Sequence, residues 1–437
     1  MPTEKVQSWG RLTDRQYSVV RPAFSQELIS ATRSGSAELL CFGLGRSYGD
    51  VCLNTDGRMI GTAGLDHFLS ADWSRGIIRA EAGMSLDALL TVCVPRGWFL
   101  PVSPGTKFVT LGGAVANDIH GKNHETAGTI GCHVRRLALV RSDNKVAELS
   151  PDQNGELFTA TIGGLGLTGV ILWVELQLVP IRSADVISET LPMPDLDAFF
   201  RISADSENWE YTVAWVDCLA RGAKIGRGLY MRGRHADSGE LKVHAGPRLS
   251  VPFDAPSFLL NSVTIGAFNA LYRWQPWQFG ARTVHYDTFF YPLDAIGQWN
   301  RLYGRRGFFQ HQCAVPAAAA PATIRRLLEL TAEFGEGSFL VVLKRLGDRA
   351  SPGILSFPLS GVTLALDFPN KGESTRRLLA RMSDIVCEAG GRLYPAKDAT
   401  MSAEHFRAGY PHWRRLETLR DPGMISDFWR RVTRETA

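Results

Sequence analysis

Apolar and polar residues alternate most clearly over residues 170–179, just before Pro180. The apolar positions of this alternation are Val174, Leu176 and Leu178, and the polar positions are Glu175 and Gln177. A period of two predicts a strand with one buried face, because successive side chains of a strand point to opposite sides. Proline lacks the N–H that a sheet ladder needs, so the strand is expected to end at Pro180.

A helical period appears in three other segments. Ser85 can cap a helix that ends before Gly97, and Ser374 can cap one that ends at Gly390-Gly391. A further helix is predicted over 321–334. The inward-facing residues are Leu86, Leu89, Leu90 and Cys93 in the first helix, Leu378, Leu379, Met382, Ile385 and Val386 in the second, and Ile324, Leu327, Leu328 and Thr331 in the third.

Strands are expected over 338–343, leading to Lys344, and over 361–368, so the chain mixes helices and strands. Its 437 residues allow two to three domains. We find no internal repeat and no low-complexity linker. Glycine motifs are lost after Pro180, which places a domain boundary near residue 182.

The composition excludes several classes of protein. Apolar residues make up 45% and charged residues 21%, which are ordinary values for a globular chain. The net charge of +4 is spread along the sequence, so no nucleic-acid partner is expected. The seven scattered cysteines show no metal-ligand spacing and favour a reducing compartment. The polar N-terminus lacks a signal-peptide core, so a cytoplasmic location is predicted.

The segment 255–291 raises the question of a membrane. Residues 255–272 are uncharged, but several polar residues interrupt them, which makes a spanning helix a poor prediction. Residues 272–291 then mix aromatic and cationic side chains, as membrane-interface segments do. They are Tyr272, Arg273, Trp274, Trp277, Phe279, Arg282, Tyr286, Phe289, Phe290 and Tyr291. Two interpretations stay open: an aromatic wall of a substrate domain, or a peripheral membrane contact.

Three glycine clusters can bring backbone N–H groups against an anion. They span 43–50, then 104–106 with Gly112-Gly113, then 163–169. The third matches G-x-G-x-x-G but opens a strand, whereas the dinucleotide fingerprint must open a helix. No Walker pattern occurs, so NAD and ATP folds of those types are disfavoured. Two amide loops without a helix dipole would suit FAD, while the alternative is that the glycines only make turns.

The stretches 43–50, 104–113 and 117–124, the last reading Asn-Asp-Ile-His-Gly-Lys-Asn-His, resemble the vanillyl-alcohol-oxidase superfamily of FAD-linked oxidases. Within it, the chain looks most like the oxidases of polyprenyl-phosphoryl ribose. The likeness continues through 289–294, 299–303, 310–316, 367–369 and 391–398.

The resemblance implies an α+β, two-domain FAD-linked oxidase fold. Residues 1–182 would form a PCMH-type FAD-binding domain, 183–391 a substrate domain of antiparallel sheet and helices, and 392–437 a segment that returns to the first domain. The expected cofactor-binding residues are Gly43, Leu44, Gly45, Arg46, Ser47, Tyr48, Gly49, Asp50, Gly105, Thr110, Leu111, Gly112, Gly113, Asn117, Asp118, Ile119, His120, Ile171 and Tyr394. Covalent members carry a histidine where Tyr48 stands, so dissociable FAD is expected.

The implied reaction oxidises the 2′-hydroxyl of a polyprenyl-phosphoryl ribose by hydride transfer to the flavin. Lys397 matches the family's lysine and would stabilise the reduced ring, and His120 and Tyr48 are the other catalytic candidates. The base stays open between His120, Lys397 and a bound water. The expected substrate-binding residues are Lys122, Gln310, Gln312, Lys344 and Ala365, with both lysines suited to the phosphate. A separate NAD(P)H-dependent ketoreductase would complete an epimerisation.

Three positions depart from the family pattern: Ala365 stands for a cysteine, Phe290 for a tyrosine and Leu346 for a phenylalanine. Alanine offers no nucleophile, so inhibitors that form a thiol adduct there are expected to fail. The substrate is therefore less firmly implied than the flavin. Two alternatives are an FAD enzyme acting on a soluble alditol, aldonolactone or sugar, and a flavin-binding protein without turnover.

Overall fold

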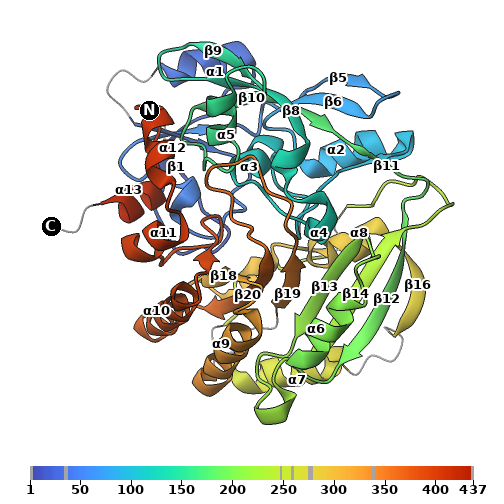
Figure 1. Ribbon diagram of the computed structural model, residues 1–437. Coiled ribbons are helices and arrows are strands. Elements are labelled where there is room, and N and C mark those ends of the chain that lie inside the picture. The colour runs from blue at the N-terminus through green and yellow to red at the C-terminus, as the bar shows by residue number, and fades with distance from the viewer. Residues whose placement is uncertain are drawn as a thin grey trace.

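The computed structural model describes residues 3–33, 38–246, 249–256, 260–273, 279–335 and 340–434 (Figure 1). The first 180 residues contribute a four-stranded sheet of order β1-β2-β4-β3 and a five-stranded antiparallel sheet of order β5-β6-β10-β8-β9. The strands are β1 (Thr3–Lys5), β2 (Gln16–Val20), β3 (Leu39–Phe42), β4 (Arg58–Gly61), β5 (Phe68–Asp72), β6 (Ile77–Glu81), β8 (Val134–Val140), β9 (Val146–Leu149) and β10 (Val170–Gln177), with β7 (Trp98–Phe99) paired to β11 (Val179–Pro180). The helices are α1 (Ser25–Thr32), α2 (Leu86–Cys93), α3 (Leu111–Ala116), α4 (His124–Ala127) and α5 (Gly155–Thr161).

An eight-stranded antiparallel sheet dominates the rest of the chain, in the order β16-β12-β14-β13-β19-β20-β18-β21. Its strands are β12 (Asp185–Met193), β13 (Tyr211–Val216), β14 (Gly228–His235), β16 (Gly280–His285), β18 (Phe308–Pro316), β19 (Val341–Leu346), β20 (Gly361–Pro369) and β21 (Arg392–Leu393), and β15 (Leu249–Ser250) pairs with β17 (Ile296–Gly297). The helices are α6 (Leu196–Ala204), α7 (Ser262–Arg273), α8 (Tyr286–Phe290), α9 (Ala320–Phe334), α10 (Glu373–Glu388), α11 (Ala403–Gly409), α12 (Trp413–Leu419) and α13 (Asp427–Thr433).

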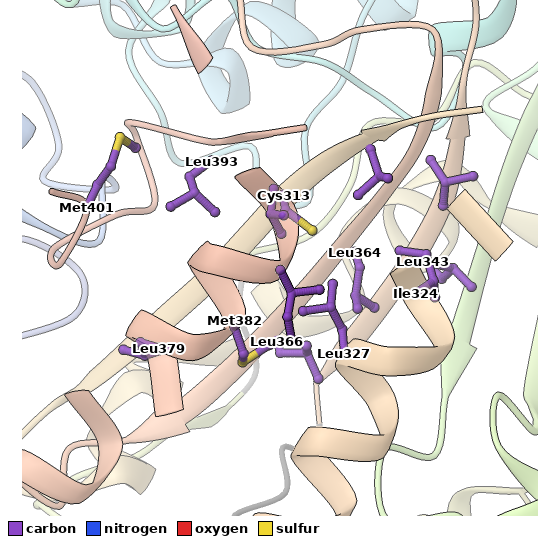
Figure 2. Close-up of a cluster of buried hydrophobic side chains, with 14 of the residues drawn as sticks. Cys313, Ile324, Leu327, Leu343, Leu364, Leu366, Leu379, Met382, Leu393 and Met401 are labelled. Carbon is purple, nitrogen blue, oxygen red and sulfur yellow. The ribbon is translucent and has the colours of Figure 1, made fainter. Parts of the chain in front are cut away.

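The largest core lies between the eight-stranded sheet and helices α9 and α10. Figure 2 shows Leu364 and Leu366 of β20 facing Leu327 of α9 and Met382 of α10. These side chains are fully buried, and each contributes about 1.5–3 kcal/mol of apolar transfer free energy. Because alternate residues of a strand face opposite ways, the other face of β18, β19 and β20 is left for a different use.

The C-terminal helices lie against residues of the first half of the chain. Arg431 of α13 forms an ion pair with Asp50 at 2.8 Å and another with Asp398 at 3.0 Å. Asp427 accepts a hydrogen bond from the Thr55 amide at 2.9 Å. The mixture of helices and antiparallel sheets confirms the expected α+β class, while the boundaries at 182 and 391 stay a prediction.

Most of the predicted elements are present, with small shifts. Ser85 caps α2 by accepting from the Ala88 amide, and the predicted helix over 321–334 corresponds to α9. The strand predicted over 170–179 is β10, which already ends at Gln177, and Pro180 is the last residue of the separate short strand β11. Lys344 lies within β19 and does not follow it, and 336–339, which include the start of the strand predicted there, lie outside the described residues.

The predicted cap of α10 is wrong. The helix begins at Glu373, so Ser374 lies in its first turn, and Gly372 with φ of +78° is the N-cap. Thr375 takes the capping role from inside the helix, since its hydroxyl accepts from the Lys371 amide and donates to the Pro369 carbonyl. Gly390, with φ of +69°, follows the end of the helix as expected.

Candidate active site

A cavity of about 560 Å³ lies between the glycine loops and the face of the eight-stranded sheet that the helices do not cover. We call the loops 43–48, 103–121 and 165–171 its cofactor side, and the cavity-facing residues of β18, β19 and β20 its substrate side. The segment 394–397 borders both sides. The volume lies in the range of about 300–1,000 Å³ that ligand pockets usually have.

The first glycine cluster offers unused amides to this cavity. Tyr48 donates its amide to the Ala396 carbonyl at 2.9 Å, which fixes the end of the loop. The amides of Leu44, Gly45, Arg46 and Ser47 donate to no other described residue, and these residues line the cavity. Gly45 has φ of +64°, which glycine adopts without strain. A bound anion such as a pyrophosphate would satisfy these donors.

The second cluster differs from the expectation of two free amide loops. Thr110 caps α3, so Gly112 and Gly113 lie in the first turn of a helix. The Leu111 amide donates to the Met84 carbonyl, and the Gly112 amide donates to the Ala82 carbonyl. These two amides, which were expected to contact the flavin, therefore hold α3 against neighbouring segments of the protein. Gly112 and Gly113 still line the cavity, but a Cβ added to Gly112 would lie 2.8 Å from the Ala82 Cβ, so this glycine allows α3 to pack closely on its neighbour.

Further features of the cofactor side fit a flavin dinucleotide. The Asn117 Oδ1 atom is buried and accepts no hydrogen bond from the described residues, although Asn117 borders the cavity. Gly166, with φ of +76°, also lines the cavity, and an added Cβ would meet no atom within 4 Å. A bulky polar cofactor would donate a hydrogen bond to the unsatisfied acceptor and would fill the space beside the glycine backbone.

Four residues expected to bind the cofactor do not line the cavity. Gly49 packs its α-carbon against the Asp398 carbonyl, and Asp50 pairs with Arg431. Leu111 is fully buried in the core beneath α3. The Asp118 carboxylate is buried and accepts from Ser351, Ser356 and the Gly131 amide, so it ties loops together. The other expected residues, including Gly105, Ile119, His120, Ile171 and Tyr394, do line it.

Strand register assembles the substrate side. Gln312 of β18 lies opposite Ala365 of β20, which lies opposite Val342 of β19. In the next rows of the sheet, Gln310 pairs with Asp367, and Thr363 pairs with Lys344. Because these residues share a face, the two glutamines, Lys344 and Ala365 all reach the cavity; their substrate-binding role, implied by the resemblance, stays a prediction.

His120 is held between Lys344 and Gln312. The Lys344 ammonium donates to His120 Nδ1 at 2.9 Å and to the Gly121 carbonyl at 2.7 Å. On the other side of the ring, Nε2 lies 3.1 Å from the Gln312 amide. Burial, with the positive charge of Lys344 second, lowers the pKa of His120 well below its ordinary value. The ring is therefore neutral, and Nδ1 is already used as an acceptor.

Two lysines reach the cavity without a carboxylate partner. Neither Lys122 nor Lys344 forms an ion pair with a described acidic residue, and both line the cavity. Burial lowers the pKa of each to about 7, and Lys122 lowers that of Lys344 further. Lys122 donates to the Phe289 carbonyl and lies 4.6 Å from the Phe289 ring centre. A desolvated, unpaired cation is costly, so this site is prepared for an anion.

Lys397 and Tyr48 meet where the two sides join. The Lys397 ammonium lies 4.0 Å from the centre of the Tyr48 ring. Burial lowers the pKa of Lys397 to about 8, and the charge of Asp367 works in the opposite direction. Burial raises the pKa of Asp367 to about 7, although this carboxyl accepts from Gln310 at 2.5 Å. Burial, with Asp367 second, raises the pKa of Tyr48 well above its ordinary value, so the phenol keeps its proton.

Two aromatic residues of the segment 286–291, Phe289 and Phe290, line the cavity. Tyr286 and Tyr291 do not line it and are almost fully buried behind them. Phe289 and Phe290 thus form an aromatic wall, as one of the two interpretations expected, while Trp274 and Trp277 lie outside the described residues. Phe290, in place of the family's tyrosine, presents no hydroxyl to the cavity, and Leu346 is buried away from it.

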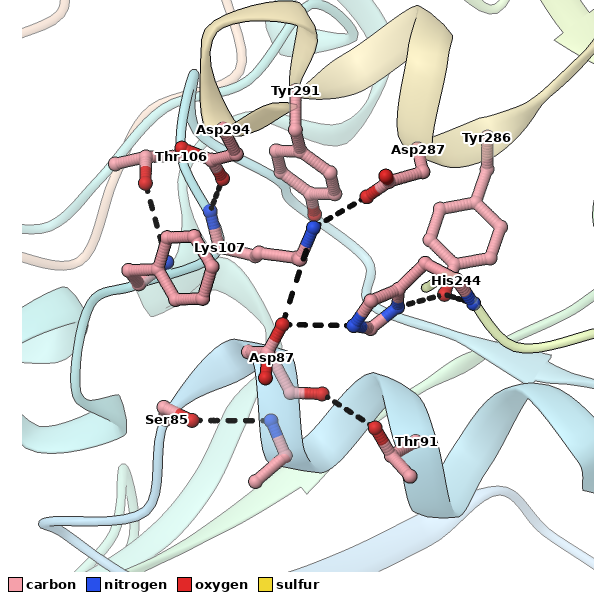
Figure 3. Close-up of polar contacts among 12 residues, drawn as sticks. Ser85, Asp87, Thr91, Thr106, Lys107, His244, Tyr286, Asp287, Tyr291 and Asp294 are labelled. Atoms are coloured by element: carbon pink, nitrogen blue, oxygen red, sulfur yellow. Dashed lines mark hydrogen bonds and ion pairs between the residues drawn. The ribbon is translucent and has the colours of Figure 1, made fainter. Parts of the chain in front are cut away.

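A buried polar cluster fixes this wall to the first half of the chain (Figure 3). Lys107 donates to Asp287 of α8 at 2.5 Å and lies 4.0 Å from Asp87 of α2. His244 bridges the same Asp87, at 2.8 Å, and the Tyr286 hydroxyl, at 2.5 Å. These contacts link four segments far apart in the sequence, and they orient α8 toward the cavity.

Sequence reasoning missed three residues of the site. Asp367, 0% exposed, was noted only as part of a family segment, yet it is the carboxyl that acts on Lys397 and Tyr48. The alternation of β20, which puts Asp367 on the same face as Ala365, could have indicated it. Tyr303 donates to Asp367 at 3.4 Å, and Trp9 stacks on Arg46 at 4.0 Å. No sequence pattern indicated these two contacts.

The comparisons with known proteins agree with this geometry. A family model described as FAD binding domain matches residues 18–150, which places the chain in the class of FAD-linked enzymes. The chain is 34% identical over 451 residues to decaprenylphosphoryl-beta-D-ribose oxidase of Mycolicibacterium smegmatis, covering 98% of this chain and 97% of that relative. The chain belongs to the family of this oxidase.

Other relatives match less of the chain. An uncharacterized protein of Streptomyces coelicolor is 33% identical over 80% of this chain and 100% of its own length. L-gulonolactone oxidase of Mus musculus is 31% identical over only 36% of this chain and 35% of its own length. The chain is thus an FAD-dependent oxidoreductase that acts on a CH–OH group, and a flavin-binding protein without turnover is not supported. No helix among the described residues has the length and apolar character to cross a bilayer.

Proposed function

We propose that this enzyme oxidises the 2′-hydroxyl of a polyprenyl-phosphoryl ribose to a 2′-keto sugar. The relative that matches almost the whole chain is named for a lipid-linked ribose, which supports this substrate. Within the chain, the observation that carries the proposal is the pair Lys122 and Lys344, two cavity lysines without carboxylate partners. A phosphodiester would supply the missing negative charge, whereas a neutral lactone or alditol would not.

The bound FAD would accept the hydride from the 2′-carbon of the sugar. We propose that it is dissociable, because Tyr48 stands where covalent members carry a histidine. The amides of 44–47 and the Asn117 Oδ1 atom would hold it.

Lys397 is the proposed base. With a pKa of about 8, a substantial fraction of its amine is neutral near physiological pH and can accept the hydroxyl proton. The ammonium that forms adds positive charge beside Tyr48 as negative charge arises on the cofactor. His120 is proposed as a positioning residue, because its Nδ1 atom already accepts from Lys344 and its other nitrogen faces Gln312.

A 2′-keto product must be reduced from the opposite face to complete a 2′-epimerisation. This chain offers no nicotinamide fingerprint, so we propose that a separate NAD(P)H-dependent ketoreductase carries out that step. The lipid-linked substrate also implies a peripheral membrane contact of an otherwise cytoplasmic enzyme.

The test uses two sugars with the FAD-loaded protein under anaerobic conditions. Farnesyl-phosphoryl ribose is expected to bleach the visible flavin band and to yield the 2′-keto sugar by mass spectrometry. L-gulono-1,4-lactone at the same concentration is expected to leave the band unchanged. If only the lactone bleaches the flavin, the proposed lipid-linked substrate is wrong and the substrate is a soluble sugar.

A further inference from the structure

Helix α7 carries three large apolar side chains on the side that faces away from the protein. Val263, Phe268 and Leu271 are 78%, 42% and 63% exposed, and their spacing places them on one face of the helix. Ile265 and Asn269, on the opposite face, are 3% and 1% exposed. Most exposed large apolar side chains of the described residues likewise lie between Leu249 and Ile296.

The contacts of α7 with the protein body include a polar anchor. The Asn269 amide donates to Asp217 at 2.8 Å, and the Tyr272 ring lies 4.9 Å from the Trp215 ring. A surface helix of a globular domain normally turns its apolar stripe inward and its polar face to water. Helix α7 buries Ile265 but exposes three larger apolar side chains, and such an apolar surface is typical of a partner or membrane contact.

The charge around α7 selects between those partners. The sequence contains no acidic residue between Asp254 and Asp287, whereas Arg273 ends the helix and Arg282 lies on the neighbouring strand β16. An apolar face whose own segment carries arginines and no carboxylate complements an anionic lipid surface, to which each arginine adds about 1 kcal/mol of attraction.

The cavity extends to this helix. Tyr272 of α7, Arg282 and Val284 of β16, and Trp215 of β13 all line it, together with the glycine loops at the other end. Figure 1 places α7 at the end of the eight-stranded sheet that is remote from β5 and β6. An acyl or prenyl chain that leaves a bilayer beside α7 would thus meet the cavity without crossing the protein.

We propose that the outer face of α7, formed by Val263, Phe268 and Leu271, inserts into the headgroup region of an anionic bilayer. The second part of the inference is that the lipid-linked substrate enters the cavity beside this helix, and it rests on the proposed function. The bilayer contact itself depends only on the exposed face and its charge.

The experiment compares three forms of the FAD-loaded full chain. They are the wild type, the triple variant Val263→Ser, Phe268→Ser, Leu271→Ser, and the matched control Phe24→Ser, Leu69→Ser, Val146→Ser, whose residues are 61%, 45% and 50% exposed elsewhere. Each is sedimented with phosphatidylcholine vesicles with and without phosphatidylglycerol. Flavin absorbance and thermal melting verify that each variant is folded.

The wild type and the control are expected to bind the anionic vesicles, and salt should weaken this binding. The affinity of the α7 variant for the same vesicles should be at least about tenfold lower. Equal sedimentation of the α7 variant and the wild type would overturn the proposal, as would no binding by the wild type. The oligomeric state of each form is measured by light scattering. If the wild type and the control are dimers and the α7 variant is a monomer, the face binds a second copy of the chain, and the proposal is overturned.

Oxidation assays with a short-chain and a long-chain substrate distinguish the failure of the bilayer contact from the failure of the proposed function. Farnesyl-phosphoryl ribose in vesicle-free buffer is expected to be oxidised equally by the wild type and the α7 variant, whereas a long-chain substrate in vesicles is oxidised more slowly by the variant. No oxidation of the short substrate by any form would refute the proposed function and leave the sedimentation result to decide the bilayer contact.

Discussion

The cofactor side and the substrate side of the cavity differ in the groups that they present. The cofactor side presents backbone: amides of 44–47, glycine surfaces at 112–113 and 166, and the unpaired Asn117 Oδ1 atom. The substrate side presents side chains held by strand register, namely Gln310, Gln312, Lys344 and Ala365. Backbone can hold one cofactor throughout a family, while side chains change with the substrate.

This difference gives separable consequences of mutation. Changes on the cofactor side should alter FAD affinity and leave sugar selectivity intact, and changes on the substrate side should do the reverse. Lys397 lies where the sides join and should affect the chemical step instead of either affinity.

The largest effect is expected for Lys397→Met. The variant should retain FAD, but its anaerobic rate of flavin reduction should fall about 10²- to 10³-fold, because a base and a stabilising charge are both lost. In the wild type, this rate should rise with pH through about 8, since only the neutral amine accepts a proton. The variant should lose that dependence, as measured by stopped-flow absorbance. A pH profile identical to that of the wild type would exclude Lys397 as the base.

Lys344→Met should weaken substrate binding about 10- to 100-fold through loss of a charge-assisted contact. For the wild type, KM should rise as pH rises through about 7, because the anion binds the protonated lysines and the proton is lost above that value. Steady-state kinetics from pH 6 to 9 measure both effects. Lys145→Met, at a lysine that is 82% exposed, serves as control and should match the wild type. An unchanged KM in Lys344→Met would remove the phosphate role.

On the cofactor side, Gly45→Ala should weaken FAD binding about tenfold or more, because a positive φ and a Cβ 2.7 Å from the Gln7 carbonyl strain the loop. Gly335→Ala is the matched control, at the end of α9, with φ of +69° and no atom of a described residue within 4 Å of the added Cβ. Titration of the apoprotein with FAD, followed by flavin fluorescence, gives both affinities. Equal losses in both variants would attribute the effect to backbone strain alone.

A smaller effect is expected for Asp367→Asn. Removing this negative charge lowers the pKa of Lys397, so the rise of the flavin-reduction rate should move below pH 8. The stability of the fold should also depend on pH through this group, because burial raises the pKa of Asp367 to about 7. The protonated carboxyl stabilises the fold in acid, and this contribution is lost as the pH rises to about 7. Thermal melting of the variant should therefore vary less between pH 5 and 8 than that of the wild type, and equal curves would contradict this assignment.

The smallest effect on catalysis is expected for Ala365→Cys. The new thiol would lie on the cavity face between Gln312 and Val342, where a cysteine-directed inhibitor of the family could form an adduct. Turnover should change by less than about threefold, because hydride transfer needs no thiol. Mass spectrometry should detect the adduct in the variant and not in the wild type, whose Cys313 faces the core. Adduct formation by the wild type would contradict this geometry.

The same comparison explains what the sequence could predict. A glycine loop is encoded by residues that are adjacent in the sequence. The loop 43–48 and most other residues of the cofactor side could therefore be proposed from short contiguous motifs. The loss of free amides at 111–112 depends on carbonyls of Ala82 and Met84, which no local pattern indicates. Asp367 and Trp9 acquire their neighbours only through sheet register and long-range packing. The exposure of Val263, Phe268 and Leu271 on α7 likewise required the structure, since apolar spacing alone does not tell which face of a helix is buried.

The most direct test of the account is anaerobic mixing of the FAD-loaded enzyme with farnesyl-phosphoryl ribose that carries deuterium at the 2′-carbon. Complete bleaching of the flavin band is expected, at a lower rate than with the unlabelled sugar, because the bond between the 2′-carbon and its hydrogen breaks as the flavin is reduced. A flavin that stays oxidised, or one that is reduced at the same rate by both sugars, would contradict hydride transfer from the 2′-carbon.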